Sequence, residues 1–176
     1  MARSVTVTTD SPAATRRLAA ALGRAARAGE IVALTGGLGS GKTTFAQALA
    51  RAAGVRSRLR SPTFVIAASY RTGRQLARQL HHLDLYRLRR LSVTDTATVT
   101  EVLGDRQAII IVEWADRLDR RQLPRNRTTF LNFRVRVNHR RVIRVVGRLS
   151  RFVPVGPGRR PLGGSADRAG PRCRSA

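Results

Sequence analysis

A glycine-rich stretch between two regular elements constrains the fold of this chain more than any other feature. The apolar run at residues 31–35 is typical of a buried parallel strand, and it passes directly into the glycines of residues 36–41. Beyond them, Phe45 and Leu49 recur at helical spacing within residues 43–53. A strand, a glycine loop and a helix in this order predict an α/β fold.

The loop satisfies the pattern GxxxxGK(S/T), which is typical of phosphate-binding loops. Its members are Gly36, Gly37, Leu38, Gly39, Ser40, Gly41, Lys42 and Thr43, and Thr44 follows them in the predicted nucleotide site. Glycines let successive backbone N–H groups turn toward a phosphate without clashes from Cβ atoms. Lys42, the single lysine of the chain, would neutralise the β- and γ-phosphates, and the Thr43 hydroxyl would bind magnesium. We therefore expect ATP, with GTP less favoured, and Mg²⁺ as cofactors.

Two carboxylates at the ends of predicted strands could complete such a site. The chain has only 10 Asp and Glu against 34 Lys and Arg, so each acid is informative. Glu113 ends the most apolar segment, as a Walker B acid does, and is predicted to bind magnesium or polarise water; the alternative is a structural ion pair with an arginine. Asp84, which alternation places on one face with His82 and Tyr86, is a second candidate metal ligand or a helix N-cap. Lys42, Asp84 and Glu113 form the predicted catalytic set.

The remaining pattern predicts one domain at residues 1–150 with a P-loop NTPase-like three-layer α/β sandwich, its sheet mainly parallel with an antiparallel edge hairpin. The predicted elements are an edge strand ending at Asp10, a helix at residues 11–28, strands at 63–70 and 80–85 around a turn at Thr72 and Gly73, a central strand at 108–114, and a hairpin of residues 128–137 and 141–146. Residues 151–176 lack periodicity and are predicted to form a basic, disordered tail.

Charge and composition limit the surroundings of the chain. The formal net charge of +24 attracts polyanions without specifying which, and it fits either a nucleic-acid or acidic partner or arginines spread over solvated faces. One cysteine, Cys173, excludes a disulfide framework, and no apolar run is long enough to span a bilayer. A cytoplasmic location without membrane contact is therefore expected.

Four motifs in series resemble one family. They are GGLGSGKTT at residues 36–44, SPTF at 61–64, HLDLYRL at 82–88 and VEW at 112–114. Over residues 5–147 the chain resembles the bacterial TsaE family, the tRNA threonylcarbamoyladenosine biosynthesis ATPases. The resemblance implies a small ATPase that assists the modification of adenosine 37 in tRNAs reading codons that begin with A. Its implied partners are the threonylcarbamoyl transferase catalytic subunit and that subunit's paralogue.

The same resemblance implies roles for individual residues. Magnesium binding falls to Thr43 and Glu113, and support of hydrolysis falls to Asp84, which is also a candidate metal ligand. Ser61 and Thr63 would act as a switch near the γ-phosphate, Trp114 would lie near the nucleotide, and Thr15 would lie close to the base.

Two other functions stay open at this point. A small-molecule kinase would share the loop and the fold, but it has no need for the HxDxYR and Glu-Trp motifs. A basic RNA-binding module with regulatory nucleotide binding would use the arginines, although among the aromatic residues only Phe130 and Phe133 are interleaved with arginine. A weak tRNA contact through the basic surface is compatible with an ATPase. The motifs leave no segment for a lid, so slow hydrolysis that depends on a partner is expected.

Overall fold

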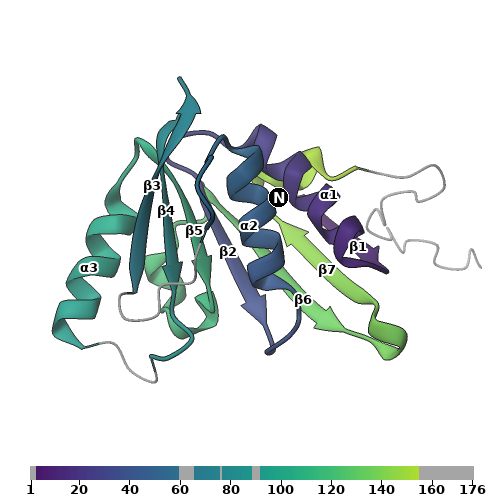
Figure 1. Ribbon diagram of the computed structural model, residues 1–176. Coiled ribbons are helices and arrows are strands. Elements are labelled where there is room, and N and C mark those ends of the chain that lie inside the picture. The colour runs from purple at the N-terminus through teal and green to yellow at the C-terminus, as the bar shows by residue number, and fades with distance from the viewer. Residues whose placement is uncertain (1–2, 60–65, 76, 89–91, 155–176) are drawn as a thin grey trace, which may run out of the picture.

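The computed structural model describes residues 3–59, 66–75, 77–88 and 92–154, which form a seven-stranded sheet with helices on both faces (Figure 1). The strands are β1 (Ser4–Thr9), β2 (Ile31–Gly36), β3 (Ala67–Arg74), β4 (Ala77–Asp84), β5 (Ala108–Glu113), β6 (Thr128–Val135) and β7 (Arg141–Val146). The α-helices are α1 (Pro12–Ala25), α2 (Lys42–Ala52) and α3 (Val93–Gly104). Four short 3₁₀ helices complete the described elements: η1 (Ala115–Arg117), η2 (Arg120–Gln122), η3 (Val137–His139) and η4 (Arg148–Phe152).

The order of the strands is β1-β7-β6-β2-β5-β4-β3. The four inner strands β6, β2, β5 and β4 pair in parallel, whereas β7, β1 and β3 add antiparallel strands at the two sides. The predicted fold class and the β6–β7 hairpin are thus confirmed. Because β1 runs in the same direction as β2, both α1 and α2 begin at the edge where the parallel strands end, which is the edge where α/β folds bind ligands.

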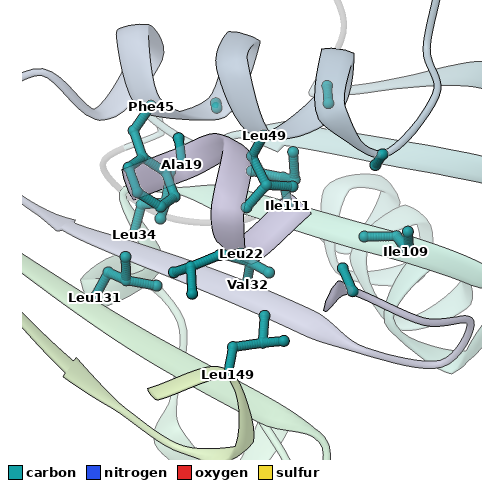
Figure 2. Packing of buried hydrophobic residues seen from close by; sticks show 14 of the residues in the cluster. Ala19, Leu22, Val32, Leu34, Phe45, Leu49, Ile109, Ile111, Leu131 and Leu149 are labelled. Atoms are coloured by element: carbon teal, nitrogen blue, oxygen red, sulfur yellow. The ribbon is translucent and has the colours of Figure 1, made fainter. Parts of the chain in front are cut away.

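Alternation along the inner strands supplies both layers of the core. In β5, Ile109 and Ile111 belong to a buried cluster with α1 and α2, while Ile110 and Val112 belong to a second cluster with α3. Figure 2 shows the first cluster, in which Leu22, Phe45 and Leu49 of the two helices approach the sheet residues Val32, Leu34 and Ile111. Burial on both faces explains why this strand is apolar throughout.

The predicted turn at Thr72 and Gly73 is wrong, because both residues lie inside β3 and the chain reverses between Arg74 and Ala77. The strand accommodates Thr72 and Gly73 through a register shift between Arg71 and Arg74. The Thr72 hydroxyl donates to the carbonyl of Ala77, and Gly73 N–H donates to the carbonyl of Gly54 at 3.0 Å. Thr72 and Gly73 therefore form an irregularity within the strand rather than a turn between two strands.

Helix α3 has no counterpart among the predicted elements. Its sequence, VTDTATVTEVLG, is rich in β-branched residues, which favour strands. A capping box between Ser92 and Asp95 starts the helix, and the hydroxyls of Thr98 and Thr100 donate to carbonyls four residues earlier. Capping and packing thus override intrinsic propensity.

The domain continues slightly beyond its predicted end at residue 150. In η4 and just after it, Leu149 and Val153 are buried in the same cluster as α1. Residues 155–176 lie outside the described part, so the disordered tail stays a prediction. Within the described residues, no helix is long and apolar enough to cross a bilayer.

Close packing of α1 on α2 predicts opposite effects for two Gly→Ala substitutions. A Cβ atom at Gly23 of α1 would lie 2.4 Å from the Leu49 carbonyl oxygen, whereas one at Gly104 of α3 would meet nothing within 4 Å. We expect Gly23→Ala to lower the free energy of unfolding by about 1–3 kcal/mol through overpacking. As the matched control, Gly104→Ala should raise it by about 0.5–1 kcal/mol. Urea unfolding of both variants measures the two changes, and equal losses would contradict the packing described.

Candidate functional site

The glycine loop lies between the end of β2 and the start of α2, with the backbone conformation that its composition predicts. Gly36, Gly39 and Gly41 have φ angles of 137°, 71° and 100°, which disfavour residues with side chains. At Gly36 a Cβ atom would also lie 2.5 Å from the Phe133 carbonyl oxygen, while Gly37 and Gly39 have open space beside them. The loop is therefore held against β6 at one end and is open at its tip.

Lys42 is buried at the base of this loop, with only 4% of its surface exposed. Its Nζ donates to the carbonyls of Gly36 and Gly37 at 2.7 and 2.9 Å, and it lies 3.6 Å from the centre of the Trp114 ring. Burial lowers the pKa of Lys42, and the nearby carboxylates of Glu113, Asp116 and Asp84, in decreasing order of effect, oppose this shift. The ammonium is thus positioned beside the loop before any ligand arrives.

Trp114 adopts a left-handed backbone conformation, with φ 59° and ψ 41°, directly after β5. This conformation costs a bulky residue about 1–3 kcal/mol, so its surroundings must hold it. The indole ring packs against Tyr86 at a centroid distance of 5.0 Å, and the Arg117 guanidinium lies 5.7 Å from it. Trp114 thus contacts the lysine of the glycine loop, while its position near a bound nucleotide stays a prediction.

Thr43, Glu113 and His82 form a chain of hydrogen bonds that joins α2, β5 and β4. Thr43 Oγ1 donates to Glu113 Oε2 at 2.8 Å, and His82 Nε2 donates to Glu113 Oε1 at 3.0 Å. The side chains of Glu113 and His82 are only 1% and 0% exposed. Sequence reasoning placed His82 on a face with Asp84 but gave it no role. The structure shows that it orients the carboxylate of Glu113.

Asp84 lies beside Glu113, because the two residues are register partners in the parallel pair of β4 and β5. Adjacent strands are about 4.8 Å apart, so both carboxylates are at the same edge of the sheet. Asp84 Oδ1 accepts from the N–H of Tyr86 at 3.1 Å and so stabilises a turn, rather than capping a helix as the alternative prediction held. Asp116 is a further nearby acid that sequence reasoning missed, since a 3₁₀ turn without a motif carries it.

Three predicted site residues remain, and the structure describes only Thr15 among them. Thr15 is buried at the start of α1, where its hydroxyl contacts Thr9 Oγ1 at 2.9 Å and donates to the Ser11 carbonyl at 3.3 Å. It lies at the same edge of the sheet as the loop, and these two hydrogen bonds tie it to the end of β1 and to Ser11, the N-cap of α1. Ser61 and Thr63 lie outside the described residues.

The oxygen donors at this edge suit a hard cation such as Mg²⁺. They comprise the hydroxyl of Thr43 and the carboxylates of Glu113 and Asp84. Among the described residues, no group of three or more His, Cys, Asp and Glu could hold a metal by itself. A magnesium ion here would need further ligands from phosphate oxygens and water, as it commonly does in nucleotide sites.

Comparison with known proteins identifies the group to which these features belong. The family model described as Threonylcarbamoyl adenosine biosynthesis protein TsaE matches residues 9–143. The chain belongs to the TsaE family. It is therefore a protein of the pathway that makes threonylcarbamoyladenosine in tRNA.

Individual TsaE proteins share substantial identity with this chain. The protein named TsaE from Mycobacterium tuberculosis (strain H37Rv) is 38% identical over 119 residues, covering 62% of this chain and 70% of that protein. The TsaE of Synechocystis is 42% identical over 98 residues, covering 54% and 59%, and that of Bacillus subtilis is 33% identical over 119 residues, covering 68% and 71%. The crystal structure of Bacillus subtilis YdiB superposes with a TM-score of 0.63 at 27% identity, covering 86% of this chain and 90% of that one.

The hydrogen bond from His82 to Glu113 predicts a contrast between two neighbouring histidines. His82→Leu leaves a buried carboxylate oxygen without its donor, which should lower the free energy of unfolding by about 1–3 kcal/mol or more. His81→Leu is the matched control, because its partners can bind water instead: the side chain of Asp105 is 31% exposed, and Ser69 is exposed as well. Denaturant unfolding compares the two variants. A larger loss for His81→Leu would contradict the importance of the buried pair.

Proposed function

We propose that this TsaE-family chain binds ATP with Mg²⁺ at residues 36–44 and hydrolyses it in support of tRNA threonylcarbamoylation. The observation that carries the proposal is the 2.8 Å hydrogen bond from Thr43 to Glu113. It brings the hydroxyl that follows the loop lysine onto the carboxylate that ends the apolar strand. These are the two protein groups that a loop of this kind needs beside a magnesium ion.

The residues present fit a bound nucleotide. Open space beside Gly37 and Gly39 leaves room for phosphate oxygens, and α2 begins directly after the loop with no acid in its first turn, which favours an anion there. Lys42 would exchange its bonds to two loop carbonyls for bonds to phosphate oxygens. When bound, Mg²⁺ supplies positive charge that neutralises the phosphate oxygens.

Glu113 is the residue to which we assign the chemistry of hydrolysis. Its carboxylate is fixed on both oxygens, by Thr43 on one side and by His82 on the other. A carboxylate held in this way can orient a water molecule and accept its proton without first reorganising. Asp84, one strand away, would orient a second water or contribute to the metal shell.

Exposure of the loop supports a role for partner proteins. Leu38 at the loop tip is 76% exposed, and Gly37 and Gly39 are exposed as well. A site open to water stabilises the charge of a transition state only weakly. We therefore assign the covering of this site to the threonylcarbamoyl transferase catalytic subunit and its paralogous partner subunit, so that hydrolysis is slow in the isolated chain.

Replacement of the loop lysine tests the nucleotide site. Lys42→Ala should lower the affinity for ATP at least roughly tenfold without unfolding the chain, because charge-assisted contacts are worth about 1.5–3 kcal/mol each. Isothermal titration calorimetry with ATP and Mg²⁺ measures the change. Arg51→Ala, which removes one positive charge from the exposed last turn of the same helix, is the control and should bind ATP as the wild type does. Unchanged affinity in a folded Lys42→Ala variant would overturn the proposed site.

A further inference from the structure

One part of the sheet has a face that no described helix covers. Helices α1 and α2 pack on one face, while α3 packs on the other (Figure 1). On that second face, α3, η1 and the nearby residues Leu118 and Leu123 cover β2, β4 and β5. Over β6, β7 and β1 that second face is open, and it forms a groove of about 650 Å³. We call it the arginine groove after its five arginines: Arg120, Arg125, Arg134, Arg136 and Arg144.

Most side chains that line the arginine groove are polar, whereas an unfinished core would be apolar; its apolar members are Phe130, Leu131, Val142 and Val146. In β7, Ile143 and Val145 point to the α1 side, so Arg144 points into the groove. The register then aligns Thr6, Arg144, Asn132 and Thr35 in one row across four strands. Asn132 Nδ2 donates to Thr35 Oγ1 at 2.9 Å within this row. A row of hydrogen-bonding groups suits a polar ligand rather than a missing helix.

The charge of the groove has one sign. No Asp or Glu among the described residues lines it. Arg144 Nε donates to Ser4 Oγ at 3.1 Å, but the guanidinium groups of the other four arginines have no hydrogen-bond or ion-pair partner within the described part of the chain. Concentration on one concave face distinguishes these arginines from a charge spread evenly over the surface, and it fits a ligand with several negative charges.

We propose that the arginine groove binds a single strand of RNA through its phosphate groups. Arg134 and Arg136 are two residues apart along the chain, and Arg134 and Arg144 are diagonal neighbours on the paired strands β6 and β7. In both pairs the Cα atoms are about 7 Å apart. Separate guanidinium groups can therefore reach separate phosphates along a strand. Threonine and asparagine side chains between them can bind sugar hydroxyls.

An acidic protein is the competing ligand, and the groove suits it less. Protein interfaces are centred on buried aromatic or aliphatic anchors, which need matching pockets. The groove offers one aromatic ring, Phe130, which is half-buried against the core and suits stacking by a base. Phe133 cannot stack there, because it is buried on the opposite face against Phe45 at 5.5 Å. The RNA contact does not depend on the proposed ATP site, since none of the five arginines belongs to it.

Fluorescence anisotropy with a labelled oligouridylate of about 12 nucleotides tests the proposal on the full chain. The groove variant is Arg134→Ser with Arg144→Ser, and the matched control is Arg16→Ser with Arg17→Ser on the exposed face of α1. Each variant removes two positive charges, so any general effect of net charge is common to both. Affinity is measured between about 0.05 and 0.2 M salt.

We expect the groove variant to lose at least roughly tenfold in RNA affinity and to reduce the slope of log affinity against log salt by about 1.4, which corresponds to two phosphate contacts. The control should lose less than about threefold, and Lys42→Ala should bind RNA as the wild type does, whatever its affinity for ATP. Equal losses in the two double variants, or wild-type affinity in the groove variant, would overturn the proposal. Displacement of the RNA by polyglutamate as readily as by unlabelled RNA would also overturn it, in favour of an acidic protein.

Discussion

The hydrogen bond from Thr43 to Glu113 is the contact on which the proposed site depends. It joins the first turn of α2 to the carboxyl end of β5, and its geometry is fixed from behind by His82. A buried carboxylate needs such partners, because an unpaired charge in the interior is costly. The same pairing that makes the carboxylate tolerable in the core holds it beside the loop lysine.

The topology of the sheet explains why these groups meet. Strands β4, β5 and β2 are parallel neighbours in the sheet. Asp84 ends β4, Glu113 ends β5 and the glycine loop follows β2, so all three lie at one edge. Strands β7 and β1 extend the sheet beyond β6, on the side away from Asp84 and Glu113. The arginine groove lies open on one face of these strands. One sheet thus carries an acidic cluster next to the loop and a separate basic face.

Local sequence patterns predicted the loop, the strand that ends at Glu113 and the β6–β7 hairpin, because each depends on residues that are close in the chain. The partnership of His82 with Glu113 was not predictable in this way, since 31 residues separate the two and only the register of β4 on β5 joins them. Helix α3 was missed because its threonines favour strands in isolation. The groove was also beyond prediction, because it depends on which face the helices leave open.

Hydrolysis of ATP by Glu113→Ala, measured with Mg²⁺ for the chain alone and together with the transferase subunits, tests the central role of this carboxylate most directly. Affinity for ATP should remain close to that of the wild type, because Lys42 and the loop are intact. The rate of hydrolysis should fall at least roughly a hundredfold, as expected for the loss of a positioned general base. Hydrolysis at the wild-type rate in both settings would contradict this role and leave Glu113 as a structural carboxylate.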